Sequence, residues 1–223
     1  MYEKSSFDDY LNKALKAWEY AEFEDTLYFV KEALKCNPKD VEAGLLFEMA
    51  SLYNAESDIG ETTNKFKQAY NSLNVGIDEA KFFDYVEQYI IFLYSESSDI
   101  AIEFKKKKKQ FGYKDTAEFV NEISSAVEAL TWFRDVFEKR GMTDKGSYYP
   151  EILLGLSICY SVMFEKSKYI TSYDGEDCDE IKWNIKGSLP DLFDEVNETL
   201  KRIKPDCKIP KVSNGKRRKF MKN

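Results

Sequence analysis

The strongest constraint on the fold is an internal repeat of two amphipathic helices near the start of the sequence. Residues 7–40 and 43–76 align with a shift of 36, and small and large side chains then recur in the same order. The matched pairs are Ala14 with Ala50, Glu22 with Asp58, Phe23 with Ile59, Thr26 with Thr62, Val30 with Phe66 and Ala33 with Ala69. Apolar residues recur every three or four positions, with polar breaks at 20–22 and 56–58, which indicates two helices in each segment. Because one helical hairpin cannot bury its apolar face alone, the repeat predicts hairpins that stack on one another.

Helical patterns continue over the rest of the chain. We expect further helices at residues 77–94, 97–111, 116–140, 149–168 and 189–203. The helix at 149–168 is apolar nearly all round in its first turns, so it should be buried between others. With 10 Gly and 5 Pro in 223 residues, an all-β fold with many turns is disfavoured. The sequence therefore predicts an all-α fold of stacked antiparallel helical hairpins.

Residues that favour helix ends agree with these boundaries. Ser6 and Asp9 have the spacing of a capping box, and Asp40 is suited to cap the third helix. Pro38 should end the second helix, because proline cannot continue it. We expect Gly76 to end the fourth helix in a left-handed conformation and Gly141 to stop the long helix at 116–140.

The first repeat unit resembles the tetratricopeptide repeat over about 34 residues, and the second does so more loosely. The residues at signature positions are Ala14, Phe23, Ala33 and Pro38 in the first unit and Ala50, Tyr53, Phe66 and Ala69 in the second. Thr26 and Thr62 stand where the family usually has alanine. The resemblance implies a TPR-like α-solenoid with a C-terminal helical cap. It divides the chain into repeats at 1–76, further hairpins at 77–203 and a basic tail at 204–223.

The resemblance also implies a function, because in this family the first helix of each unit lines a groove that binds protein or peptide segments. The matching candidates here are Leu11, Leu15, Trp18 and Glu19, with Phe47, Ser51 and Asn54 from the second unit. Leu11 and Leu15 stand where carboxylate-clamping members carry Lys and Asn, so that specificity is not expected. Later helices could instead cover this face and make it core, and the sequence leaves both outcomes open.

Charge is unevenly spread along the chain. The net charge is −7 overall, but residues 204–223 hold eight Lys/Arg and one Asp, so the rest of the chain is strongly acidic. The tail residues Lys216, Arg217, Arg218, Lys219 and Phe220 suggest an alternative function, a tether to nucleic acid or to an anionic membrane. A second basic run, Lys105–Lys109, points all around a helix and is expected to be a solvated face.

Residues that support common enzyme chemistry are missing. The chain has no histidine, which removes the commonest general base and metal ligand, and it has no Gly-rich phosphate loop. The acidic residues Asp177, Asp179 and Glu180 do not match a calcium-binding loop. We therefore expect a non-enzymatic scaffold with no cofactor and no metal.

The cysteines and the longest apolar stretch bear on the compartment. None of the four cysteines is in a CxxC pair, and Cys36 and Cys159 lie in apolar patterns, where a thiol packs as a small hydrophobe. The longest apolar stretch, residues 152–164, is too short for a membrane span, and no signal peptide is evident. These features favour a reduced, cytoplasmic protein.

Overall fold

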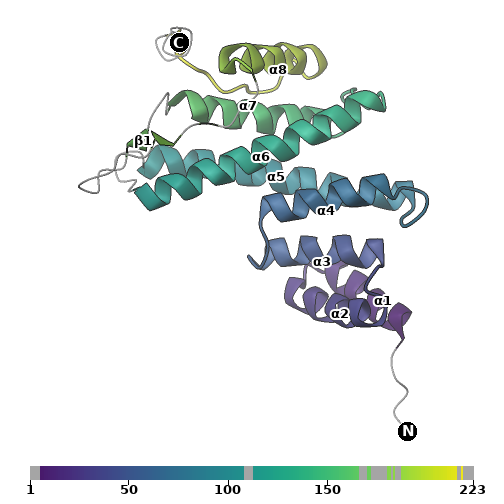
Figure 1. The fold of residues 1–223 in the computed structure, drawn as a ribbon. Coiled ribbons are helices and arrows are strands. Elements are labelled where there is room, and N and C mark those ends of the chain that lie inside the picture. The colour runs from purple at the N-terminus through teal and green to yellow at the C-terminus, as the bar shows by residue number, and fades with distance from the viewer. Residues whose placement is uncertain are drawn as a thin grey trace. The chain divides into compact units, whose positions relative to one another are not determined.

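The computed structural model describes residues 6–107, 113–165, 170–171, 180–181, 183, 187–214 and 217. These residues form eight α-helices and one two-residue strand pairing, which confirms the all-α prediction (Figure 1). The helices are α1 Phe7–Glu19, α2 Phe23–Cys36, α3 Val41–Tyr53, α4 Ile59–Asn71, α5 Glu79–Lys107, α6 Tyr113–Lys139, α7 Tyr149–Glu165 and α8 Leu189–Ile203. The chain divides into two compact units, Met1–Tyr89 and Ile90–Asn223, and α5 contributes residues to both. None of the helices in the described ranges combines the length and the apolar character needed to span a bilayer.

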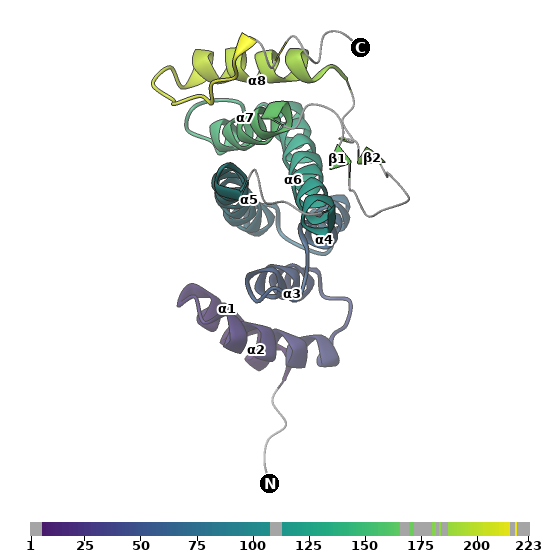
Figure 2. The ribbon, with the colours of Figure 1, turned by 90° about the vertical axis from the view of Figure 1, so that its left-hand side faces the viewer.

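Unit 1, Met1–Tyr89, begins with two helical hairpins, α1–α2 and α3–α4. Figures 1 and 2 show α3 between the first hairpin and α4. The predicted caps are present. The Ser6 hydroxyl accepts from the Asp9 backbone N–H at 3.3 Å, the Asp9 carboxylate accepts from the Ser6 N–H at 3.0 Å, and the Asp40 carboxylate accepts from the Ala43 N–H at 2.8 Å. The α2 helix ends at Cys36, two residues before Pro38, as expected.

The two hairpins share one turn geometry. Ala21 follows α1 at φ 56°, and Ala55 follows α3 at φ 55°. In both turns the next N–H reaches back to a helix carbonyl, from Glu22 to Ala17 at 2.9 Å and from Glu56 to Ser51 at 2.8 Å. This backward bond around a left-handed residue satisfies carbonyls at the helix end. The second hairpin therefore repeats the first in detail at its turn.

The single shift of 36 holds for only part of the repeat. The bounds of α1 and α3, and the two turns, are offset by 34, whereas α2 and α4 begin 36 residues apart. The difference lies in the second loop, where Ser57 and Asp58 follow the shared turn and Asp58 accepts from the Glu61 N–H at 2.8 Å to cap α4. Pairing Ala14 with Ala50 is therefore wrong by two residues along the helix. Pairing Thr26 with Thr62 and Ala33 with Ala69 agrees with the helix starts.

The core of unit 1 is built from small residues where helices approach and aromatic residues beside them. Ala14, Ala33 and Ala50 are fully buried, and so are Thr26 and Thr62. The Phe66 ring on α4 stacks on Tyr89 of α5 with centroids 4.8 Å apart. The Tyr89 hydroxyl also donates to the Ile59 carbonyl at 2.8 Å, which joins the start of α4 to α5.

The end of the fourth helix differs from the prediction at Gly76. The helix stops at Asn71, and Asn74 rather than Gly76 takes the left-handed conformation, at φ 62°. Asparagine tolerates that region because its short amide bonds locally. Gly76 is needed for a different reason, since a Cβ there would lie 2.6 Å from Cγ2 of Val41.

The predicted break between residues 94 and 97 does not exist. The segment contains no glycine or proline, and α5 runs unbroken from Glu79 to Lys107. The hydroxyls of Ser97 and Ser98 donate to the carbonyls four residues earlier, at 2.7 and 2.9 Å. Both side chains therefore bond within the helix and do not interrupt it.

Unit 2, Ile90–Asn223, has α7 at its centre, which confirms the expected burial of that helix. Figures 1 and 2 show α7 between α6 and α8. Its buried residues lie all round the helix and include Ile152, Leu156, Cys159, Tyr160 and Phe164. The α6 helix ends before Gly141, which has φ 70°, as predicted. Cys159 is a buried thiol as expected, whereas Cys36 is exposed, so its expected role in the core is wrong.

A short strand pairing lies in the sequence between α7 and α8. Strands β1, Ile170–Thr171, and β2, Glu180–Ile181, pair antiparallel, with Ile170 opposite Ile181 and Thr171 opposite Glu180. The acidic residues Asp177 and Asp179 lie outside the described residues.

Candidate functional site

The predicted groove residues of α1 form one stripe on that helix. Leu11, Leu15 and Trp18 are each half-buried, and Glu19 is exposed. The spacing of three and four residues puts the first three on one side of the helix. The two leucines are therefore packing residues with part of their surface open to solvent.

Trp18 is the centre of an aromatic cluster. Its ring meets Phe23 edge-on at 5.3 Å and Tyr53 edge-on at 5.6 Å, and Phe23 and Tyr53 stack on each other at 4.4 Å. The indole Nε1 donates a 2.8 Å hydrogen bond to the Gln88 side chain on α5. We call Trp18, Phe23, Tyr53 and Gln88 the aromatic face. Tyr53 is its most open ring, at 39% exposed.

The other three predicted groove residues do not join this face. Ser51 is 1% exposed and belongs to the core, because it lies on the side of α3 that packs inward. The Asn54 amide donates to the carbonyls of Phe23 and Ala50 at 3.1 and 3.0 Å, so it holds the turn. The Phe47 ring lies under the Lys31 ammonium of α2, at 5.9 Å from its centroid. These placements correct the prediction for Ser51 and give Asn54 and Phe47 structural contacts.

An ion pair joins the start of α3 to the start of α5. The Lys81 ammonium on α5 donates to the Glu42 carboxylate on α3 at 2.8 Å. Tyr85, one turn further along α5, is buried, and burial together with the Glu42 charge raises the pKa of its hydroxyl well above the usual value. The phenol is therefore neutral at physiological pH.

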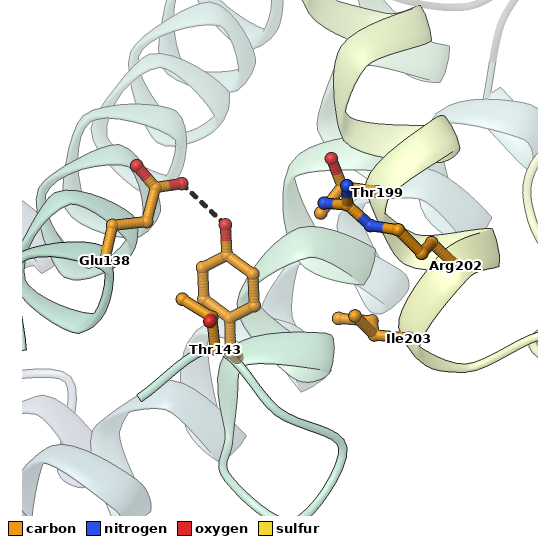
Figure 3. Close-up of a pocket in the computed structure, with 6 residues that line it drawn as sticks. Glu138, Thr143, Thr199, Arg202 and Ile203 are labelled. Carbon is orange, nitrogen blue, oxygen red and sulfur yellow. Dashed lines mark hydrogen bonds between the residues drawn. The ribbon is translucent and has the colours of Figure 1, made fainter. Parts of the chain in front are cut away.

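Unit 2 carries a polar hollow of about 410 Å³ that sequence reasoning missed (Figure 3). It is lined by Glu138, Thr143, Tyr149, Thr199, Arg202 and Ile203. These residues come from the end of α6, the following loop, the start of α7 and the last turns of α8. No sequence signal joins them, because they become neighbours only when the three helices pack.

Glu138 and Tyr149 are coupled in this hollow. The Tyr149 hydroxyl donates to Oε1 of Glu138 at 2.5 Å. Burial and the neighbouring Glu138 charge raise the pKa of Tyr149, so its hydroxyl stays protonated and keeps donating. Arg134 lies one turn earlier on α6, with its guanidinium 3.9 Å from Glu138 and 3.4 Å from Glu195 of α8.

Of the five tail residues predicted to bind a partner, Arg217 is among the described residues. The Arg217 guanidinium pairs with the Asp194 carboxylate of α8 and lies 5.7 Å from the Phe193 ring centroid. Lys216, Arg218, Lys219 and Phe220 lie outside the described residues, as do Lys108 and Lys109 of the internal basic run. The tether remains a prediction, and Arg217 is already engaged with α8.

Chemistry-bearing clusters are sparse in the described part of the chain. No group of three or more acidic, cysteine or histidine side chains there could hold a metal ion. No family model, curated protein or solved structure matches this sequence. Functional proposals therefore depend on the contacts described above.

Proposed function

We propose that this chain is a non-enzymatic adaptor that binds a protein or peptide segment on the aromatic face of unit 1. The observation that carries the proposal is the placement of Trp18. Its ring is held by Phe23 and Tyr53 and by a hydrogen bond to Gln88, residues from three other helices. Tryptophan and tyrosine are the residues that most often anchor protein interfaces. Because these side chains are already fixed, a partner would lose little of its binding energy to ordering them.

A TPR-like solenoid arrangement of the hairpins is part of the same proposal. It is supported by the repeated turn, with Ala21 and Ala55 in the same left-handed conformation. It is also supported by the contacts of α3 and α5, the helices that would be the first of the second and third units. Glu42 of α3 pairs with Lys81 of α5, and Tyr53 of α3 packs on Trp18 of α1.

Charge indicates the chemistry of the partner. Unit 1, residues 1–89, contains nine lysines, no arginine and eighteen acidic residues, a net charge of −9. A negative surface speeds the encounter with basic segments and repels acidic ones. We therefore expect a segment that combines Lys or Arg with an apolar or aromatic anchor.

The test is selection of peptides from a random displayed library on the full chain, followed by affinity measurements with variants. Tyr53→Ala should weaken the selected peptides at least about tenfold, as expected for an interface anchor. Tyr28→Ala is the matched control, because Tyr28 is 58% exposed and lies outside the aromatic face. Equal losses in both variants, or selected peptides without basic residues, would contradict the proposal.

A further inference from the structure

The hollow of unit 2 has walls of opposite charge. Figure 3 shows the Glu138 carboxylate on one side and the Arg202 guanidinium on the other. Its volume of about 410 Å³ lies in the range of sites that bind small molecules. This site is independent of the aromatic face, which belongs to unit 1.

The Arg202 wall has unused donors. Among the described residues, Arg202 forms no ion pair, and its side chain is exposed. Thr199 lies three residues earlier on α8, so it faces the same side of the helix. A guanidinium beside a hydroxyl is a good match for a carboxylate, because both groups donate to its two oxygens.

The Glu138 wall has unused acceptor capacity. The Tyr149 hydroxyl and the Arg134 guanidinium both approach Oε1 of Glu138. A carboxylate has room for about four hydrogen bonds. A ligand ammonium can therefore bind Glu138 without displacing Tyr149, whose hydroxyl holds the carboxylate in place.

The two walls together select against ligands of a single charge. A simple anion on Arg202 would face the Glu138 carboxylate, and a simple cation on Glu138 would face Arg202. Like charges placed close together cost binding free energy. A molecule with both charges satisfies both walls.

We propose that this hollow binds a small zwitterion of the amino-acid class, with its carboxylate on Arg202 and Thr199 and its ammonium on Glu138. The Thr143 hydroxyl and the Ile203 side chain complete the lining and contact the ligand side chain. The same charge pairing would leave a free amine or a free carboxylic acid bound much more weakly.

The experiment uses the ¹⁵N-labelled full chain and two-dimensional NMR. L-Glutamine, L-serine and L-leucine are titrated to about 20 mM, because a few charge-assisted hydrogen bonds correspond to millimolar affinity. N-acetyl-L-glutamine lacks the ammonium, and L-glutaminamide lacks the carboxylate. We expect saturable shifts of the Thr143, Thr199 and Arg202 amides with at least one amino acid, and binding at least about tenfold weaker for the derivatives of glutamine if glutamine binds.

Charge-neutralising variants test the two walls separately. Arg202→Gln and Glu138→Gln should each weaken binding at least about fivefold, and Glu138→Gln keeps an acceptor for Tyr149. Lys201→Gln and Glu198→Gln are matched controls on exposed positions of α8 outside the hollow, and they should stay within about twofold. The proposal fails if none of the three amino acids shifts these amides, if both derivatives bind as well as the parent, or if the controls weaken binding as much as the wall variants.

Discussion

The indole Nε1 of Trp18 donates a 2.8 Å hydrogen bond to Oε1 of Gln88, 70 residues further along the chain. This bond joins the first helix of unit 1 to its last. A partly buried side-chain hydrogen bond contributes about 1 kcal/mol to stability. Trp18→Phe and Gln88→Leu should each lower the free energy of unfolding by about that amount or more. A double-mutant cycle by urea unfolding should give a coupling near 1 kcal/mol, and a coupling near zero would mean that the bond does not form in solution.

Glutamates on α5 and α6 that lie close to one another should make the stability of the fold depend on pH. Burial, and then the charges of Glu103, Glu96 and Glu118, raise the pKa of Glu122. A carboxyl whose pKa is raised in the folded state favours folding below its unfolded pKa, and this contribution is lost as pH rises through the folded pKa. Glu122→Gln should therefore stabilise the chain at pH 7, by about 0.3 kcal/mol after solvent screening.

Calorimetry at pH 5 and pH 7 checks this prediction. The wild-type melting temperature should fall between pH 5 and pH 7 by more than that of Glu122→Gln. Glu198→Gln on α8 is the control and should behave like wild type. A variant that is less stable than wild type at pH 7 would contradict the assignment.

Replacing an alanine that has a left-handed backbone conformation by glycine should stabilise the fold, whereas the same replacement in a helix should destabilise it. Ala21 has φ 56°, a region that costs an L-residue with a Cβ about 1 kcal/mol or more. Ala21→Gly removes that strain, and glycine's larger loss of backbone entropy on folding offsets part of the gain, so the free energy of unfolding should rise by about 0.5 kcal/mol. Ala80→Gly, at an exposed position in the first turn of α5, should lower it, by less than the roughly 1 kcal/mol that glycine costs in a helix interior. Chemical denaturation of both variants measures the signs, and a loss at Ala21 would refute the argument.

The close approach of Gly76 and Val41 should not tolerate a side chain. A Cβ at Gly76 would lie 2.6 Å from Cγ2 of Val41, so Gly76→Ala should destabilise the chain by about 1–3 kcal/mol. Val41→Ala removes the clashing methyl groups, so in that background the added Gly76→Ala should cost clearly less. Thermal unfolding of the two single variants and the double variant tests this. Simple additivity would show that the contact is not the cause.

Two cysteines should differ sharply in reactivity. Cys36 is exposed, whereas Cys159 is buried and its burial raises the pKa of the thiol to about 11. Since the thiolate is the reactive form, iodoacetamide at pH 8 should modify Cys36 quickly and Cys159 only in denaturant. Mass spectrometry of the digested protein reads both sites, and rapid labelling of Cys159 in the native protein would contradict the buried placement.

Local signals predicted much of the fold. Periodicity located α8 at its observed bounds, Leu189–Ile203, and the caps at Ser6 and Asp40 were read correctly because capping depends on residues three apart. Two local predictions failed. The break expected between residues 94 and 97 is absent, because Ser97 and Ser98 bond within α5, and Gly76, expected at a left-handed helix end, serves a close contact.

The candidate sites were less predictable. Trp18 was identified from its position on α1, but Gln88 has no local feature that links it to Trp18, and only packing brings the two together. Ser51 was expected in a groove, but most residues of α3 are buried, so this helix has little open face to line one. Glu138 and Arg202 are more than sixty residues apart, and no pattern of spacing predicts that they share a hollow.

The longer loop between α3 and α4 is a position where the fold should accept inserted residues. The repeat accommodates Ser57 and Asp58 after a turn that is otherwise the same as the first, and both flanking helices keep their regular ends. A short epitope or fluorophore-binding peptide inserted between Glu56 and Ser57 would leave the Asp58 cap of α4 intact. Such an insertion would give a labelled protein for binding measurements without altering either the aromatic face or the hollow of unit 2.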